Sequence, residues 1–370
     1  MKKTLCLLLV IVMTFGIFAA VSAEAKKPKV GISMPTKTLE RCSRDGTYLE
    51  QHFKEAGYDT ILTYADNNID TQVNDLQNML ADEVSLLIVF AVDGESLNTV
   101  MDEAKRLNVP VIAYDRLILN DAVSYYVSFD NYQVGKLQGQ FVEKALDLPN
   151  AGDKVFNIEF TGGDPADHNA LFFFNGAFDV IKPYIDSGKV KVPSGQTEFA
   201  KVATDRWDTN IALNRASNVL ASYYAGGTKL DAWICSNDAV SLGVQQALES
   251  DYRGDNHVVV TGQDGETANL AKIADGKQDM TVYKNVKDEA VVTLALAKAM
   301  LSGKVDGEAL AKSVGVPCVF NTESYQTSEG HNCPSFLLTP MVITKDNLQA
   351  LVDTGVYVKG DDGYLKPVQQ

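Results

Sequence analysis

The chain has 370 residues and is acidic, with 48 aspartates and glutamates against 33 lysines and arginines, a formal net charge of -15. Such acidity argues against a nucleic-acid partner. Hydrophobic residues make up 45% of the chain, which is typical of a folded globular protein, and nothing in the composition indicates disorder.

The first 23 residues have the features of a secretory signal peptide. Lys2 and Lys3 precede the apolar stretch LCLLLVIVMTFGIF, and the compact run AAVSA follows it. Val21 and Ala23 provide the small-residue spacing of a cleavage site, so we predict cleavage after Ala23. A membrane anchor is the alternative, but the apolar stretch is shorter than the ~20 residues that a span needs. The sequence therefore predicts an exported protein.

The 347 residues that remain (370 minus 23) are too many for one ordinary core and suit two domains. Strand-like and helix-like segments alternate along them. Leu49, Phe53 and Ala56, for example, recur at helical spacing after the strand-like run at 30 to 34. Further helices are expected near 95 to 107, 133 to 146, 168 to 183, 209 to 222, 239 to 250, 266 to 275 and 287 to 302. This alternation predicts an α/β protein with parallel sheets and helices on both faces.

The chain is expected to pass between two lobes several times. The segment SYYVSFDN, which ends at Asn131, is typical of a strand followed by a helix, and we expect the first crossing there. A second crossing is expected at GQDGE, residues 262 to 266, and a third between 304 and 340. The predicted first lobe spans 28–130 plus 265–305, and the predicted second lobe spans 131–264 plus 306–370. Several crossings form a hinge, and a ligand would bind in the cleft between the lobes.

Polar side chains follow several of the predicted strands. In an open α/β sheet, ligands bind beyond the carboxyl ends of the strands. A sugar hydroxyl both donates and accepts hydrogen bonds, so a selective sugar site needs carboxylates, cationic donors and amides. The candidate acceptors are Asp93, Asp115, Asp238 and Asp264, the candidate donors are Arg41, Arg116 and Lys284, and the candidate amides are Asn169 and Asn237.

Each candidate also has a structural explanation. An aspartate after a strand is often the N-cap of the next helix. Asp115 and Arg116 could form a surface ion pair, which would contribute little. Trp207 could be the flat platform that packs against the apolar face of a sugar, with Phe173 and Phe174 behind it, or a core residue. The sequence leaves these alternatives open.

The sequence shows no motif for catalysis or for a cofactor. The four histidines lack metal-ligand spacing, and there is no HExxH, GxSxG or GxxxxGK segment. Paired carboxylates could hydrolyse glycosides, but the sequence does not show the separation that this reaction needs. We therefore predict a protein without enzymatic activity, metal or cofactor.

Four cysteines remain after the signal. Cys318 and Cys333 flank the polar stretch VFNTESYQTSEGHN, which a disulfide would stabilise by about 3 kcal/mol in the chain-entropy model. We predict this disulfide. Cys42 and Cys235 fall in different predicted units, and we expect them to be free, partly buried thiols.

Seven segments resemble one family in the same order. They are VGISMPTKTLERCSRDG, VIAYDRLI, VSFDNYQVG, NALFFFNGA, SNDAVSLG, VTGQDGE and TVYKNV. Over nearly the whole mature chain they resemble the periplasmic monosaccharide-binding proteins of ABC importers, especially the xylose-binding and multiple-sugar-binding type. The resemblance implies the type I periplasmic binding protein fold, in which two Rossmann-like, doubly wound lobes joined by a hinge close over one pyranose without catalysis.

The resemblance also implies particular sugar contacts. These fall on Arg41, Asp93, Arg116, Asn169, Trp207, Asp238, Asp264 and Lys284, and we add Asn237 from its place beside Asp238. Two features differ from the family. Cys42 occupies a position where an aromatic residue is usual, and the stretch between Cys318 and Cys333 is unlike the sugar-binding relatives.

We therefore predict a monomeric periplasmic receptor that captures an aldopyranose of the xylose, glucose, galactose or arabinose class. Its partners would be the monosaccharide and an inner-membrane ABC permease, without nucleic acid. One alternative is a chemotaxis or signalling-sugar receptor on the same fold, whose partner would be a chemoreceptor. Another is an exported sugar-modifying enzyme.

Overall fold

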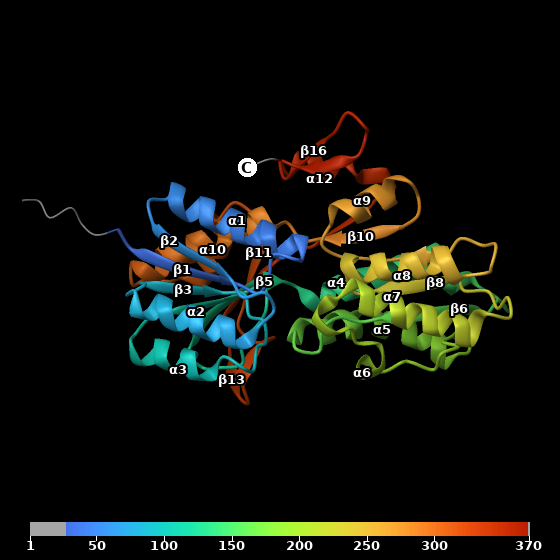
Figure 1. Cartoon of the computed structure of the whole chain (residues 1–370), viewed down its shortest axis with the longest axis horizontal. Coiled ribbons are helices and arrows are strands. Elements are labelled where there is room, and N and C mark those ends of the chain that lie inside the picture. The colour runs from blue at the N-terminus through green and yellow to red at the C-terminus, as the bar shows by residue number, and fades with distance from the viewer. Residues whose placement is uncertain (1–26, 369–370) are drawn as a thin grey trace, which may run out of the picture.

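The computed structural model describes residues 27–368, which form two lobes side by side (Figure 1). The predicted signal peptide, residues 1–23 with cleavage after Ala23, lies outside the described residues. Between residues 27 and 368, no helix is long and apolar enough to cross a membrane.

The first lobe contains a seven-stranded sheet. Its strand order is β11-β14-β5-β4-β3-β1-β2, and every neighbouring pair is parallel except β11 with β14. The strands are β1 (Lys29–Met34), β2 (Asp59–Tyr64), β3 (Leu86–Val89), β4 (Val111–Tyr114), β5 (Val123–Phe129), β11 (Cys318–Asn321) and β14 (Ser335–Leu338). The short apolar strands are buried, as expected for a parallel sheet with helices on both faces.

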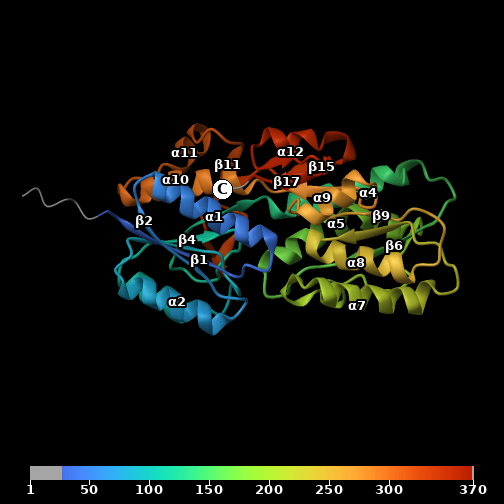
Figure 2. The same ribbon diagram turned by 45° about the horizontal axis from the view of Figure 1, so that its top comes forward.

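Two hydrophobic clusters cover the two faces of this sheet. Leu86 and Ile88 of β3 pack into one cluster, and Leu87 and Val89 pack into the other, because successive side chains of a strand point to opposite faces. The helices of this lobe are α1 (Glu40–Glu55), α2 (Ile69–Ala81), α3 (Asn98–Arg106), α10 (Val286–Leu301) and α11 (Gly307–Ser313). Helices α1 and α10 lie together on one face and α2 lies on the other (Figure 2).

The second lobe contains a parallel four-stranded sheet in the order β7-β6-β8-β9. Its strands are β6 (Phe156–Thr161), β7 (Val190–Lys191), β8 (Ala232–Cys235) and β9 (Val259–Val260), and β10 (Met280–Tyr283) joins through a bridge between Gln263 and Val282. Its helices are α4 (Asn131–Ala145), α5 (His168–Asp186), α6 (Phe199–Val202), α7 (Thr209–Val219), α8 (Asp238–Asp251) and α9 (Thr267–Ala274). Helices α4 and α5 approach closely at Gly135, where a Cβ would collide with the Phe173 carbonyl.

The chain crosses between the lobes three times. The first crossing joins β5 to α4, as predicted at Asn131. The second joins β10 to α10, after Tyr283, so the prediction of a crossing at 262 to 266 is wrong. Strand β10 continues the second lobe, because Val282 pairs with Gln263 and Met280 and Val282 are buried in the core of that lobe. The third crossing lies between β14, which ends at Leu338, and β15 (Met341–Thr344), within the predicted interval.

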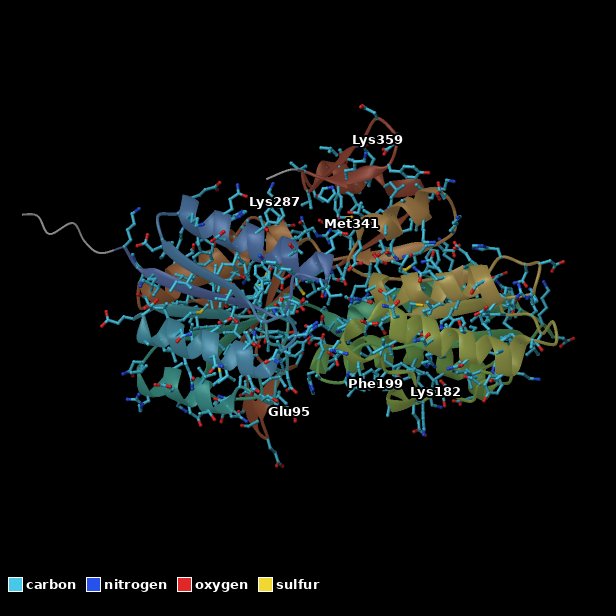
Figure 3. All side chains as sticks on the ribbon, viewed as in Figure 1. Glu95, Lys182, Phe199, Lys287, Met341 and Lys359 are labelled. Carbon is cyan, nitrogen blue, oxygen red and sulfur yellow. The ribbon has the colours of Figure 1, made fainter. Side chains whose placement is uncertain are left out.

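The predicted assignment of 306–370 to the second lobe is also wrong for its first half. Helix α11 and strands β11 and β14 belong to the first lobe, where β14 extends the sheet beside β5. After β15, which pairs with β10, the chain forms α12 (Gln349–Asp353) and the hairpin of β16 (Tyr357–Lys359) and β17 (Leu365–Pro367). Figure 3 shows Met341 and Lys359 in this terminal segment, which lies beside α9 and β10.

The structure contradicts the predicted disulfide between Cys318 and Cys333, because both are free thiols. Cys318 lies opposite Leu338, and Asn321 lies opposite Ser335. Cys333 therefore lies about five residues further along the ladder, or ~16 Å at ~3.3 Å per residue, whereas a disulfide needs Cα atoms within ~7 Å. The two side chains also pack on opposite faces of the sheet.

The stretch between these cysteines is ordered without a covalent link. Strand β12 (Gln326–Ser328) pairs with β13 (His331–Asn332), and Tyr325 and Cys333 are buried in the cluster on the α2 and α3 face. Cys42 and Cys235 are free, as predicted, but they are fully buried and not partly buried.

Candidate functional site

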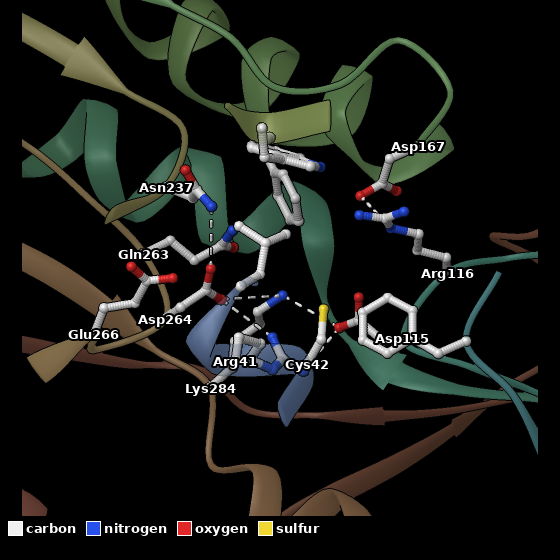
Figure 4. Close-up of a pocket in the computed structure, with 14 residues that line it drawn as sticks. Arg41, Cys42, Asp115, Arg116, Asp167, Asn237, Gln263, Asp264, Glu266 and Lys284 are labelled. Carbon is white, nitrogen blue, oxygen red and sulfur yellow. Dashed lines mark hydrogen bonds and ion pairs between the residues drawn. The ribbon is translucent and has the colours of Figure 1, made fainter. Parts of the chain in front are cut away.

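A cavity of about 360 Å³, including the part that is open to solvent, lies in the cleft between the lobes (Figure 4). We name it the inner cavity. It is lined by Leu39, Arg41, Cys42, Phe90, Asp115, Arg116, Asp167, Phe173, Trp207, Asn237, Gln263, Asp264, Glu266 and Lys284. Side chains from both lobes and from the second crossing therefore meet in one space.

Arg41, the second residue of α1, forms the densest set of ion pairs in the inner cavity. Its Nε lies 2.8 Å from Asp45 Oδ2, its Nη1 lies 3.1 Å from Asp264 Oδ1, and its Nη2 lies 2.8 Å from both Asp115 Oδ2 and Glu289 Oε2. Burial lowers the pKa of Arg41, but Asp115 and the other carboxylates raise it well above its usual value. The guanidinium is therefore a permanent cation that is fixed in one orientation.

Asp115 follows β4 and lies between two cations. Its Oδ2 accepts from Arg41 and also lies 3.3 Å from the Lys284 ammonium. Burial opposes ionisation of this carboxyl, but Arg41, Lys284 and Arg116 outweigh burial and lower its pKa to about 2. Its φ of 56° is in the left-handed region, which is costly for a residue other than glycine. Asp115 is thus a strained, permanently charged acceptor.

Arg116 connects the two lobes across the cleft. Its Nη1 donates to the backbone carbonyls of Ala91 and Val92, and its Nε lies 2.9 Å from Asp167 Oδ2. Asp167 is the N-cap of α5 in the second lobe. Figure 4 shows this pair at one end of the cavity, apart from the group around Arg41. The guanidinium also lies over the ring of Phe90, 5.2 Å from its centroid.

The second lobe contributes aromatic and amide groups. The Trp207 ring packs against Gly163, where a Cβ would collide with the indole, so only glycine fits behind it. Phe173 lies beside Trp207, with ring centroids 6.2 Å apart. Asn237 is the N-cap of α8, and its Nδ2 donates to Asp264 Oδ2 over 3.4 Å. This wall offers a flat apolar surface next to a hydrogen-bonding edge.

Among residues 27 to 368, no group of three histidine, cysteine, aspartate or glutamate side chains could hold a metal ion. The lining of the inner cavity includes no histidine. Its donors and acceptors surround a space that has an aromatic face. This arrangement suits a neutral polyhydroxylated ring.

A family model for a periplasmic binding protein domain matches residues 30–305. The chain belongs to this family. It is 38% identical to the multiple sugar-binding periplasmic receptor ChvE of Rhizobium radiobacter, over 98% of this chain and 99% of the relative. It is 32% identical to the D-xylose-binding periplasmic protein of Escherichia coli, over 90% of this chain and 91% of the relative.

A solved structure is also similar. An ABC transporter solute-binding protein from Clostridium phytofermentans, with bound β-D-glucose, is 42% identical and superposes with a TM-score of 0.84, over 90% of this chain and 99% of that chain. The comparisons confirm the predicted family and the type I fold of two α/β lobes. The two curated relatives are named as sugar-binding periplasmic proteins, and the solved structure is named as the solute-binding protein of an ABC transporter.

Six of the nine predicted site residues line the inner cavity of this periplasmic binding protein. They are Arg41, Arg116, Trp207, Asn237, Asp264 and Lys284. The other three lie outside the lining. Asp93 is partly exposed, and its Oδ1 accepts from the backbone N–H of Glu95 at 2.7 Å. Asn169 is buried behind the cavity, where its Nδ2 donates to the Asp115 carbonyl at 2.6 Å.

Asp238 lies behind the wall of the second lobe and is fully buried. Its Oδ1 accepts from Gln278 Nε2, and its Oδ2 accepts from the Glu266 backbone N–H and the Thr281 hydroxyl. Burial raises its pKa to about 8. Asp238 therefore fixes the loop that carries Asp264 and Glu266 instead of facing the cavity itself.

Several lining residues were absent from the predicted site. Asp115 was a candidate acceptor because it follows a strand, but it was not among the sugar contacts that the resemblance implied. Asp167, Gln263 and Glu266 were not proposed. Gln263 and Glu266 flank the predicted Asp264, so proximity in sequence could have found them. Asp167 does not directly follow β6 but ends the loop between β6 and α5, and its place as the cap of α5 could have suggested it.

Proposed function

We propose that this protein is a periplasmic solute-binding protein that captures an aldopyranose in the inner cavity and delivers it to an ABC permease. One observation carries the proposal. A single interlobe space combines the aromatic surface of Trp207 and Phe173 with charged donors and acceptors fixed by Arg41, Asp115 and Lys284. Aromatic faces pack against sugar C–H groups, and charged partners make the stronger hydrogen bonds to hydroxyls.

The class of sugar is supported by the relatives and by the cavity. The similar proteins are named for multiple sugars, for D-xylose and for β-D-glucose. Cys42 is one of the small side chains in the lining, so the wall beside Arg41 is set back. We infer that both pentopyranoses and hexopyranoses, whose hydroxymethyl group needs this extra room, are ligands.

Contacts across the cleft stabilise the closed arrangement of the two lobes. The Arg116–Asp167 ion pair and the hydrogen bond from Asn169 to the Asp115 carbonyl both join the first lobe to the second. A sugar that contacts both walls would favour closure in proportion to its greater affinity for the closed state. If that state were ~1% populated without sugar, apparent affinity would fall ~100-fold below the intrinsic value.

The location and partners complete the proposal. The relatives are named as periplasmic proteins and as the solute-binding component of an ABC transporter. We propose export with cleavage after Ala23, a monomeric mature protein, and recognition of its closed form by an inner-membrane permease.

Calorimetric titration tests the proposal. The mature protein is unfolded and refolded to remove any bound sugar, and then titrated with xylose, glucose, galactose, arabinose and ribose. We expect saturable one-to-one binding to one or more aldopyranoses, and recovery of the sugar unchanged. Absence of binding heat for all five would refute the monosaccharide assignment. Conversion of the sugar would indicate the enzyme alternative instead.

A further inference from the structure

A second pocket opens between the lobes next to the inner cavity, and we name it the outer pocket. It encloses about 900 Å³, including space open to solvent. It is lined by Thr36, Thr38, Leu39, Asp66, Asn67, Arg206, Trp207, Asp208, Thr209 and Asn210. Leu39 and Trp207 line both spaces, so the outer pocket adjoins the inner cavity along these two side chains.

The lining of the outer pocket has free hydrogen-bonding capacity. The side chains of Asp66, Asn67, Arg206 and Asn210 form no hydrogen bond or ion pair with other residues in the range 27–368. They supply a carboxylate, two amides and a guanidinium from the two facing lobes. These are the same types of group that line the inner cavity, where most of them are paired.

The backbone fixes the boundary between the two spaces. Arg206 and Trp207 have φ values of 55° and 56°, and two consecutive residues in the left-handed region are costly unless their surroundings hold them. Trp207 lines both spaces, and the exposed Arg206 lines only the outer pocket of the two. On the opposite lobe, Asn67 also has a positive φ, and its N–H donates to the Pro35 carbonyl at 2.8 Å.

We propose that the cleft also accepts disaccharides, with one pyranose ring in the inner cavity and the second ring in the outer pocket. This inference rests on the proposed function, because the first ring occupies the monosaccharide site. The two charge signs and the neutral amides of the outer pocket suit a second uncharged, hydroxyl-rich ring better than an ionic group. Trp207 would contact the first ring, while Asp66, Asn67 and Arg206 would bind hydroxyls of the second.

Calorimetry with matched sugars tests this inference. The refolded mature protein is titrated with glucose, xylose and galactose, and in parallel with cellobiose, maltose, xylobiose and lactose. We expect at least one disaccharide to bind one-to-one and to be displaced by the monosaccharide. If a monosaccharide binds but no disaccharide does, the second site is overturned and the proposed function stands. If neither class binds, the proposed function fails as well.

Two variants separate the pockets. Thr38→Trp should fill the outer pocket and abolish disaccharide binding, while monosaccharide affinity stays within about twofold, because Thr38 lines only the outer pocket. Arg206→Ala should weaken the disaccharide about tenfold, as expected for loss of a charged hydrogen bond, and leave the monosaccharide unchanged. Arg253→Ala, at an exposed arginine of the same lobe, is the control. Equal weakening of both sugar classes by Thr38→Trp and by Arg206→Ala would contradict the proposal.

Discussion

The two walls of the inner cavity are built differently. On the first lobe, Arg41 pairs with Asp115 and with carboxylates behind the wall, such as Asp45. On the second lobe, Trp207 and Asn237 present a ring and an amide that are supported by backbone and capping contacts. The first wall is a network of ion pairs that hold each other in one geometry. The second wall consists of an aromatic ring and an amide without such a network.

Because of this difference, we expect the two walls to contribute differently to sugar selectivity and to sugar affinity. Fixed charges discriminate between hydroxyl orientations, because a mismatched hydroxyl leaves a buried charge without its partner. An aromatic face packs favourably against any sugar ring that has an exposed C–H surface. We infer that the first wall determines which sugar is selected, and that the second wall adds affinity for pyranoses in general. Variants that damage one wall at a time can test this division.

Arg41→Ala should have the largest effect. It leaves a cluster of buried carboxylates without their common cation, and breaking a buried ion pair in this way typically costs ~3–5 kcal/mol. Urea unfolding should show this loss, and calorimetry should show no sugar binding. The control is Arg106→Ala, whose side chain is 69% exposed and pairs with Glu103, and which should change the stability by less than ~0.5 kcal/mol. A loss below ~1 kcal/mol for Arg41→Ala would show that the network is not needed for folding.

Asp238→Asn should change the pH dependence of the stability. The native carboxyl has a pKa of about 8, raised by burial, whereas in the unfolded chain it titrates near 4. The native state therefore holds a proton that the unfolded state lacks between about pH 4 and 8, so the free energy of unfolding falls as pH rises through this window.

The amide in Asp238→Asn cannot ionise, so this contribution should disappear. The variant should lose less stability than the parent between pH 5 and pH 8, by up to a few kcal/mol at ~1.4 kcal/mol per pKa unit. Thermal unfolding at several pH values measures the slope. Identical slopes for Asp238→Asn and the parent would contradict a protonated Asp238.

The two tryptophans of the chain allow a matched test of the second wall. Trp207 lines the cavity, whereas Trp233 is buried in β8, where its Nε1 donates to the Thr161 hydroxyl. Trp207→Phe should weaken sugar binding roughly tenfold, about 1.4 kcal/mol, and should also lower the melting temperature, because the Trp207 ring is buried in a core cluster beside Phe173. Trp233→Phe should lower the melting temperature and leave the affinity unchanged.

Fluorescence gives a second measurement on the same pair. Sugar should change the emission of Trp233→Phe, which retains Trp207, but not the emission of Trp207→Phe. The reverse assignment would show that the indole in the cleft does not contact the ligand. If Trp207→Phe weakens the binding of pentoses and of hexoses to a similar extent, the second wall contributes affinity for pyranoses in general.

Much of the site was predictable because parallel strands bring their carboxyl ends together. Arg116, Asn237, Asp264 and Lys284 all follow strand-like runs, and the fold places them around one cavity. The alternating segments predicted the α/β class for the same reason. Both inferences depend on local patterns that repeat along the chain.

Other features depend on contacts that no local pattern records. The second crossing was predicted about twenty residues too early, because the periodicity of α9 is the same whichever lobe it packs on. The predicted disulfide failed because spacing along the chain does not show that Cys318 and Cys333 lie on opposite faces of a sheet. Glu289 pairs with Arg41 from a helix that is distant in sequence.

Asp93→Ala should have the smallest effect on stability and on sugar affinity. It tests whether every aspartate that follows a strand of the sheet contacts the ligand. Asp115 follows β4 directly, whereas Asp93 lies a few residues beyond the end of β3, and its carboxylate accepts from the Glu95 N–H at a partly exposed position. Its loss should change the stability by less than ~0.5 kcal/mol and the sugar affinity by less than about twofold, as for most surface substitutions. Asp115→Ala is the matched comparison, because it removes a buried partner of Arg41 and Lys284 and should abolish binding. A tenfold loss of affinity in Asp93→Ala, measured by calorimetry, would instead place Asp93 in the first wall and extend that wall to β3.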